Sequence, residues 1–327
     1  MCSFMLEFQK FLDSDIDAES WDKFVESSDN GTIFHKRRFL SYHPTERFPD
    51  ASLVFKKNNK LFGVFPSTII ERDGKRVLSS HSGASYGGVA YPSNLNLRDS
   101  FDLVEGIIEY AKQEHCNRIQ ITPPPVIYQS KYSNYFDFAL IKNHFHFLKR
   151  ELTSVVQLDF PKDDLLAMYR PEARTSVKKA MKKGVEIVEC EQFAEYYEIL
   201  KKNLKMRHNV SPTHTLDELL KLKSLFPTRI RLWGAFLEDK LIAGVCNFSA
   251  NDKVVLAFYI SHNEDYQEYR PVNLLFYEIM KRYQEEGFKF LDFGLFTVNM
   301  DPNWGLARFK ENFGARGIFR DSYFLDI

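Results

Sequence analysis

The sequence predicts an α/β (α+β) fold of two similar units, each with a mixed, mostly antiparallel sheet flanked by helices. The first observation is a repeated hairpin: residues 52–65 and 231–245 both read as a strand, a polar turn ending in lysine, and a second strand that begins with leucine. The second is that an amphipathic helix and a short apolar strand follow each hairpin. The third is length, because 327 residues with 44% hydrophobic content favour two domains over one.

The two copies can be aligned residue by residue. Lys60 pairs with Lys240 and Ile121 pairs with Phe293, and the first copy carries about eight extra residues between hairpin and helix. Within each copy, the strand after the helix can lie parallel to the strand before it through a right-handed crossover. That topology places the start of the helix beside splayed strands, where backbone N–H groups point toward a ligand.

The first half of the chain divides into elements by its apolar spacing and its turn residues. Trp21, Phe24 and Val25 stand at helical spacing. Consecutive prolines at 123–125 end a strand, because proline cannot donate to a ladder. The predicted order is helix 17–27, a second helix beginning within 32–42, hairpins over 51–70, a small-residue loop at 82–88, helix 100–115 and strand 118–122.

The second half begins with an aromatic and polar connection over 126–150. Gly184 is the expected C-cap of a basic helix, and Thr215 is the expected N-cap of a later one. The predicted order is strand 155–160, helix 163–183, strand 185–188, helix 191–206, helix 216–225, the second copy over 229–294 and a tail over 303–315. We expect an N-terminal domain over 1–148 and a C-terminal domain over 149–327.

Composition narrows the class of protein. The 44 basic and 44 acidic residues cancel, which argues against a global field for nucleic acid or membrane surfaces. The four cysteines lack metal-ligand spacing, so we expect reduced thiols and no metal. The first ten residues lack a long apolar segment and no apolar stretch of about 18 residues occurs, so we expect no signal peptide and no membrane span. These features predict a cytoplasmic protein.

Two cationic features suit an anion such as phosphate. The segment 270–275 begins a helix with proline at the first helical position, where N–H groups and Arg270 are available. Arg170, Arg174 and Lys178 stand four residues apart on the basic helix and share one face. The alternatives are an ordinary helix start and a solvated charged face. The candidates for cofactor binding are Arg270, Val272, Asn273 and Leu274.

Four residues are candidates for the chemistry of a reaction. His208 and His214, close to Arg207, are natural acid–base groups near neutral pH, although loop hydrogen bonding would also explain them. Asp292 interrupts an apolar strand, and a buried carboxylate needs a partner. Lys310 is either that partner, in a structural ion pair, or a cation that stabilises a developing oxyanion. The sequence does not indicate which of these residues is the general base.

Several motifs together resemble the FemAB-like branch of the GNAT acyltransferase superfamily, and the resemblance covers most of the chain. They are Leu291-Asp292-Phe293-Gly294 with the following 309–314, the basic helix and Gly-Val at 174–185, Tyr86-Gly87-Gly88, and 270–275. The resemblance implies two tandem GNAT-like domains. It implies that Lys310 lies near the reacting carbonyl and Arg174 near acceptor phosphates. It also implies a phosphate contact near Lys36 and a substrate-binding glycine loop at Tyr86. The small-residue loop, the basic helix and the segment before His208 add Ser82, Lys178 and Arg207 as candidates for substrate binding.

The resemblance implies an N-acyltransferase of the bacterial cell envelope. The expected reaction transfers an acyl group from acyl-CoA, with no permanently bound cofactor, to an amine on a nucleotide-linked or lipid-linked sugar or an envelope precursor. We also expect transient association with the inner membrane face and no stable nucleic-acid partner. The alternatives are aminoacyl-tRNA-dependent addition to a peptidoglycan bridge and a ligand-binding module without catalysis. Two family features are missing, the helical-hairpin arm and the glycine-rich pyrophosphate loop, whose place residues 270–273 hold. We expect an acceptor-side first copy, a donor-side second copy, and a site in the groove that they form together.

Overall fold

The computed structural model of the chain describes residues 6–44, 46–161, 164–208 and 210–327, with the backbone alone for Arg207 and His208. The chain divides into two compact units. The first unit comprises the residues up to Glu151 together with Phe319–Ile327, and the second comprises Leu152–Ile318. The last residues thus return to the first unit, whereas the sequence had placed them in the second domain. The reason is a strand pairing, in which Tyr323 lies opposite Ile121.

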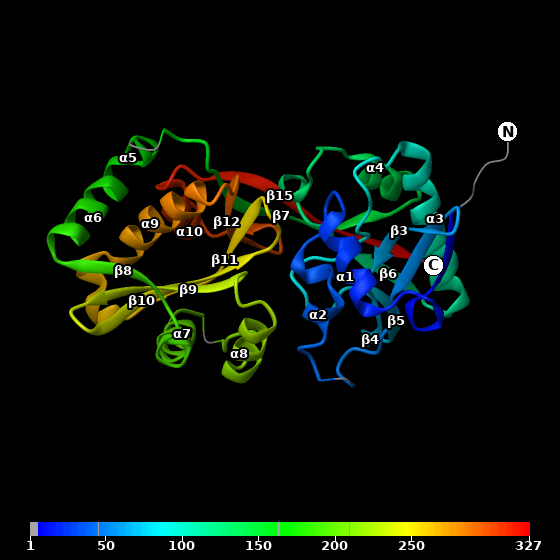
Figure 1. Ribbon diagram of the computed structural model, residues 1–327, viewed down its shortest axis with the longest axis horizontal. Helices are drawn as coiled ribbons and strands as arrows, with labels where there is room; N and C mark the ends of the chain where they lie inside the picture. The colour runs from blue at the N-terminus through cyan, green and yellow to red at the C-terminus, as the bar shows by residue number, and fades with distance from the viewer. Residues whose placement is uncertain (1–5, 45, 162–163, 209) are drawn as a thin grey trace. The chain divides into compact units, whose positions relative to one another are not determined.

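Two sheets form the first unit (Figure 1). The smaller sheet consists of three antiparallel strands in the order β1-β2-β3. The larger has the order β4-β5-β6-β15, in which β5 and β6 are parallel and the other neighbours are antiparallel. The strands are β1 (Glu7–Lys10), β2 (Leu53–Lys57), β3 (Lys60–Phe65), β4 (Thr68–Arg72), β5 (Lys75–Ser80), β6 (Arg118–Ile121) and β15 (Arg316–Asp326).

Helices cover both faces of the smaller sheet. Helix α3, which connects β5 to β6, packs with α4 in an apolar cluster that includes Phe55 and Ile119. Helix α1 packs through Trp21 on the opposite side of β2 and β3, against Val54 and Val64. The helical segments are η1 (Phe11–Asp13), α1 (Ala18–Ser27), η2 (Ile33–His35), α2 (Arg37–Leu40), α3 (Leu97–Gln113), η3 (Val126–Tyr128) and α4 (Tyr135–Lys142).

One large sheet forms the second unit, in the order β7-β12-β11-β10-β9-β8. Only β11 and β12 are parallel among these neighbours, and α9 (Pro271–Glu285) connects them, as the repeat predicts. The strands are β7 (His146–Gln157), which begins in the first unit, β8 (Val185–Cys190), β9 (Ile230–Leu237), β10 (Lys240–Ser249), β11 (Val254–His262) and β12 (Phe290–Leu295), with a separate hairpin of β13 (Thr297–Val298) and β14 (Asp301–Pro302).

Helices lie on both faces of this sheet (Figure 1). Helices α6 and α9 pack on one face around Val177, Leu275 and Ile279. Helices α7 and α8 pack on the other, against β10, β11 and β9. The helical segments are α5 (Leu165–Met168), α6 (Pro171–Lys182), α7 (Phe193–His208), α8 (Leu216–Leu225), η4 (Glu264–Tyr269), α9 (Pro271–Glu285) and α10 (Trp304–Glu311). Thr215 caps α8, because its hydroxyl accepts the N–H of Glu218.

Three predicted helices and connections differ from the structure. The helix predicted over 163–183 is two helices, because Tyr169 and Arg170 are extended and a residue before proline disfavours the helical region; residue 163 itself lies outside the described residues. The helix predicted within 32–42 is a 3₁₀ turn and a four-residue helix. Its break is at Lys36, where the Asp22 carboxylate accepts the next two N–H groups. The connection predicted over 126–150 contains α4 and the start of β7.

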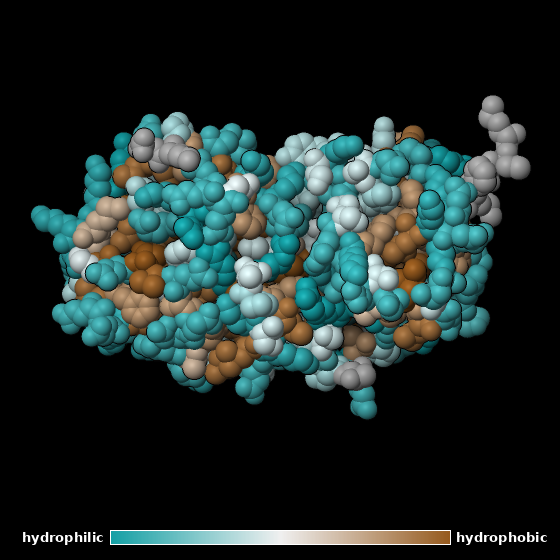
Figure 2. Space-filling view, viewed as in Figure 1, coloured by the Kyte–Doolittle hydropathy of each residue, from teal (hydrophilic) through white to brown (hydrophobic). Residues whose placement is uncertain are grey.

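The surface and the cysteines agree with the composition. Figure 2 shows mostly hydrophilic residues on the visible face, with apolar residues gathered in recesses between them. Cys116, Cys190 and Cys246 are buried and free, and burial raises the pKa of the Cys246 thiol far above its usual range. Cys2 lies outside the described residues. In the described part of the chain, no helix is long and apolar enough to cross a membrane.

Candidate functional site

The second unit contains a groove of about 740 Å³ at the end of β11. Its walls come from the start of α9, from α6, from the last part of α7 and from α10. These segments are distant in sequence, and the sheet brings them together at the carboxyl end of β11. Ligands of parallel strand–helix–strand units bind at this end, where helix N-termini carry partial positive charge.

The parallel pair β11 and β12 opens toward the groove. The two strands pair only at three positions, Val254 with Phe290, Val255 with Leu291 and Leu256 with Asp292. Beyond this point β11 continues to His262 without a partner on that edge among the described residues. Its pairing with β10 also skips Phe258, so β11 contains a β-bulge. An open strand edge offers backbone N–H and C=O groups to a ligand.

Three of the four predicted cofactor-binding residues line this groove. Arg270 has a left-handed backbone (φ 58°) and precedes Pro271 at the first helical position of α9. Val272 supplies a first-turn N–H without an intrahelical acceptor, whereas the N–H of Asn273 bonds to the Arg270 carbonyl. Leu274 is only 3% exposed and belongs to the apolar core. The start of α9 therefore offers one charged side chain and few backbone donors.

Lys310 is tied to the backbone of β12. It is 2% exposed on α10, and its Nζ donates to the carbonyl oxygens of Gly294 (2.8 Å) and Leu295 (2.7 Å). Burial lowers the pKa of Lys310 to about 8, and the charge of Asp292 acts in the opposite direction. The side chain thus fixes the end of β12 next to the helix that forms one wall of the groove.

Asp292 is fully buried and has close partners of its own. Its carboxylate accepts hydrogen bonds from the Thr153 hydroxyl on β7 and from the Gly294 N–H (2.8 Å). Gly294 has a left-handed backbone (φ 76°), and the pairing of β12 with β7 shifts between Asp292 and Leu295. These contacts stabilise the bend at the end of β12, and Asp292 does not line the groove.

The predicted histidines occupy other positions. His214 is 3% exposed, its Nδ1 lies 2.9 Å from the Tyr259 hydroxyl, and its ring packs against Phe258. It is part of the packing against β11 and does not line the groove. The side chains of Arg207 and His208, at the end of α7, lie outside the described residues.

The basic residues of α6 do not form one anion-binding row. Arg170 precedes the helix and pairs with Glu311 (2.7 Å), and Arg174 donates to the Tyr169 carbonyl (3.1 Å). Lys178 is exposed. Glu172, on the same helix, lines the groove instead.

In the first unit, the predicted substrate-binding residues lie near the loop that follows β5. The Nε2–H of His35 donates to the Gly87 carbonyl (2.9 Å), because Nδ1 accepts from Thr32, so the segment with Lys36 lies beside the loop with Tyr86. Lys36 is 3% exposed and bonds to Glu26, and Tyr86 is 1% exposed below the Arg320 guanidinium. Ser82 donates to the Ser79 hydroxyl (3.1 Å).

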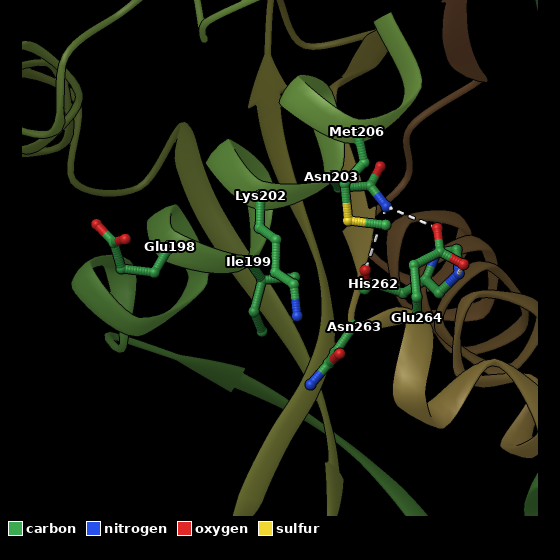
Figure 3. A pocket seen from close by; sticks show the side chains of 8 residues that line it. All are labelled: Glu198, Ile199, Lys202, Asn203, Met206, His262, Asn263 and Glu264. Atoms are coloured by element: carbon green, nitrogen blue, oxygen red, sulfur yellow. Dashed lines mark hydrogen bonds and ion pairs between the residues drawn. The ribbon is translucent and has the colours of Figure 1, made fainter. Parts of the chain in front are cut away.

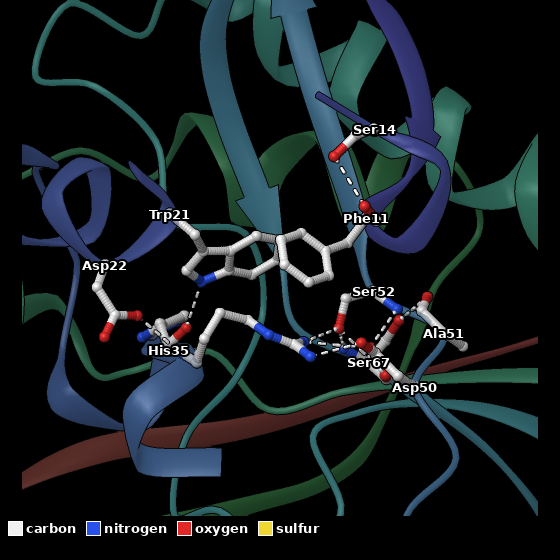
Figure 4. Close-up of polar contacts among 10 residues, drawn as sticks. Phe11, Ser14, Trp21, Asp22, His35, Asp50, Ala51, Ser52 and Ser67 are labelled. Atoms are coloured by element: carbon white, nitrogen blue, oxygen red, sulfur yellow. Dashed lines mark hydrogen bonds and ion pairs between the residues drawn. The ribbon is translucent and has the colours of Figure 1, made fainter. Parts of the chain in front are cut away.

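A neighbouring ion pair explains the position of Lys36. Arg37 donates from both terminal guanidinium nitrogens to the Asp50 carboxylate and lies 4.3 Å from the ring centroid of Phe11. The indole of Trp21 donates to the His35 carbonyl (Figure 4). These buried contacts anchor the segment 35–37 from both sides.

No group of three or more His, Cys, Asp or Glu residues that could hold a metal occurs in the described part of the chain.

Sequence reasoning missed several polar residues of the groove, among them His262 and Asn312. His262, the last residue of β11, lines it, and Glu264 follows two residues later. Asn312 also lines it, with a buried Oδ1 that has no hydrogen-bond partner among the described residues. The only sequence signal for His262 is a histidine at the end of an apolar run, directly before a polar turn.

Comparison with known proteins gives a family match in the second unit and a fold likeness over the whole chain. Residues 169–311 match the family model described as an acetyltransferase (GNAT) domain. The solved structure of FemX is similar, with a TM-score of 0.74 at 14% identity over 98% of this chain and 97% of that one. A comparison with curated protein sequences found no match.

Two further solved structures share the fold. The C-terminal domain of a putative lysylphosphatidylglycerol synthetase from Agrobacterium fabrum has a TM-score of 0.61 at 13% identity, covering 94% of this chain and 91% of that one. A tandem GNAT protein from the clavulanic acid biosynthesis pathway has a TM-score of 0.53 at 12% identity, with 98% of each chain covered. The family match identifies a GNAT acetyltransferase domain over residues 169–311 of the second unit, and the likeness to these solved structures shows that the chain as a whole shares its fold with FemX and with a tandem GNAT protein.

Proposed function

We propose that the protein transfers an acyl group from acyl-CoA to a primary amine and that the donor binds in the groove of the second unit. The amine nitrogen attacks the thioester carbonyl, a C–N bond forms, the C–S bond breaks, and the proton lost by the amine is balanced by the proton gained by the thiol. Holding both reactants in one geometry supplies much of the rate. The amine belongs to a nucleotide-linked or lipid-linked sugar or an envelope precursor.

The observation that carries the proposal is the open edge of β11 beside the start of α9. The pantetheine arm of CoA contains two amide groups, which suit unpaired backbone groups of a strand edge. The unpartnered Oδ1 of Asn312 can accept one amide N–H. The phosphates then lie at the start of α9, next to Arg270 and the N–H of Val272.

Lys310 and Asp292 take supporting parts in this proposal. Two of the three N–H bonds of the Lys310 ammonium already reach Gly294 and Leu295, and Asp292 is bound by Thr153 and Gly294. We therefore propose them as positioning residues that hold the end of β12 away from β11. The loop with Ser82 and Tyr86, together with Lys36, is proposed for the acceptor side. Arg174 and Lys178 are proposed for acceptor phosphates, with Arg207 nearby in sequence. A cytoplasmic location and transient contact with the inner membrane face stay predictions.

Calorimetric titration tests the donor site. We expect CoA and acetyl-CoA to bind the full chain, and Arg270→Ala to weaken binding about 10-fold, the effect of losing one charge-assisted hydrogen bond. Pantetheine, which lacks the phosphates, should bind both proteins alike. Arg282→Ala, near the opposite end of the same helix, is the matched control. Equal CoA affinity of the Arg270 variant, or no CoA binding at all, would contradict the proposal, and the second result would favour a ligand-binding module for another molecule.

A second donor, aminoacyl-tRNA, is favoured by a different observation. Pro271 has no N–H and the N–H of Asn273 is already bonded, so the start of α9 offers a pyrophosphate fewer donors than a glycine-rich loop would. The fold likeness to FemX fits this alternative as well. Transfer from tRNA charged with a radiolabelled amino acid to amine acceptors, compared with transfer from acetyl-CoA, distinguishes the two donors.

A further inference from the structure

A histidine, a carboxylate and an amide lie close together at the end of β11. The Nε2 of His262 lies 3.6 Å from Oε2 of Glu264. The amide of Asn203, on α7, donates to Oε1 of Glu264 (3.2 Å) and to the backbone carbonyl of His262 (3.3 Å). Figure 3 shows the carboxylate beside the imidazole, with the amide above both. Asn203 is only 8% exposed, so this arrangement is anchored in the fold.

His262 also faces two spaces. It lines the groove of the second unit and also a smaller cavity of about 260 Å³ beside α7 (Figure 3). Its side chain is 14% exposed, which leaves it accessible from the groove while the neighbouring carboxylate is held in place. The separation of 3.6 Å is longer than a hydrogen bond, so Glu264 acts on the imidazole as a nearby negative charge, which stabilises the charged form of a histidine that serves as a base.

We propose that His262 is the proton acceptor of the transfer reaction, with Glu264 and Asn203 as positioning residues. The inference rests on the proposed function. As the amine nitrogen forms the C–N bond, its proton passes to the imidazole. When the C–S bond breaks, the imidazolium returns that proton to the leaving thiolate, so the histidine is regenerated. The amine is thus expected to approach the thioester from the side of the groove that His262 lines.

The surrounding charges support a histidine that can hold a proton. Glu264 lies closest, Glu198 and Lys202 line the smaller cavity on the α7 side, and Glu172 and Arg270 line the groove. The three acidic groups favour an imidazolium, and the two cations, Lys202 and Arg270, oppose it from solvent-exposed positions. Two of the predicted bases, His214 and Asp292, do not line the groove and are buried among their own partners, and the side chain of His208 lies outside the described residues.

Two variants test the inference by release of free CoA thiol from acetyl-CoA with a panel of primary amines. His262→Gln should lower kcat/KM by about 100-fold or more, the usual contribution of a general base, while CoA affinity by calorimetry stays unchanged. Glu264→Gln keeps an oxygen for Asn203 and removes only the charge. It should move the acidic limb of the pH–rate profile to lower pH, which a merely structural role would not do. His146→Gln, an exposed histidine on β7, is the control.

The outcomes separate this inference from the proposed function. If the wild type turns over acetyl-CoA and His262→Gln has the same kcat/KM, the assignment of the base is overturned, whereas the proposed acyl transfer is not. An unmoved pH limb in Glu264→Gln overturns the role of the carboxylate. A wild-type protein that turns over neither acetyl-CoA nor charged tRNA overturns both. If only charged tRNA is used as donor, the same variants are compared in that reaction.

Discussion

Because the Lys310 ammonium is buried, we expect the free energy of unfolding to rise with pH in alkaline solution. Its pKa is about 8 in the folded protein, against 10.5 for an exposed lysine. Between these values the unfolded chain holds a proton that the folded protein has released, so the free energy of unfolding increases with pH. From about pH 7 to about pH 9.5 this single group adds ~2 kcal/mol, from ~1.4 kcal/mol per pKa unit.

The perturbation that isolates this effect is Lys310→Met. Urea unfolding of wild type and variant is measured at several pH values, and the stability of the variant is subtracted, so that other titrating groups cancel. The difference should grow by ~2 kcal/mol over that range in favour of the wild type. Lys178→Met, at an exposed lysine, should give a constant difference. A constant difference for Lys310→Met as well would refute the burial of a charged ammonium at this position.

Three further substitutions test the contacts around the candidate sites. Thr153→Val removes a donor from the buried Asp292 and should destabilise the second unit by ~2 kcal/mol in urea unfolding. Arg37→Met removes the two-pronged ion pair with Asp50 and should lower the free energy of unfolding of the first unit by ~2 kcal/mol. High salt should weaken this pair in the wild type less than it would weaken an exposed pair. Burial lowers the pKa of His35 to about 4, so the stability of wild type relative to His35→Gln should fall by ~3 kcal/mol as the pH drops from about 6.5 to about 4. Differences that do not depend on pH would contradict the buried neutral imidazole.

The repeat in the sequence was enough to predict the frame of both units. The parallel pairs β5–β6 and β11–β12, each with one helix between its strands, follow from the same order of hairpin, helix and strand. Even the residue alignment holds, because Gln120 and Asp292 are each the third residue of the strand after the helix. Local patterns of this kind depend on neighbouring residues and on the periods of helix and strand, which a single sequence displays.

What the sequence could not display depends on contacts between distant segments. The return of β15 to β6 joins residues about 200 positions apart, and nothing in its apolar pattern names its partner. The candidate base His262 ends β11 and is positioned by Asn203 on the distant helix α7, so its spacing from other histidines carries no signal. His214 was a candidate because of its type, yet the fold places it against Tyr259.

The difference between the copies lies in how their parallel strands end. In the first unit β5 and β6 stay paired to their last residues, Ser80 with Ile121. The glycine loop then folds back over these ends, where Gly87 donates to the Thr122 carbonyl (2.8 Å) and Gly88 donates to the Ser80 hydroxyl (2.6 Å). A side chain at Gly87 would meet the Ser80 carbonyl at 2.3 Å, so glycine is required for this closure. In the second unit the strands separate after three pairs and the same place is open. The glycine loop of the first copy therefore fills the position at which the second copy offers a groove, which is why we assign the donor to the second unit alone.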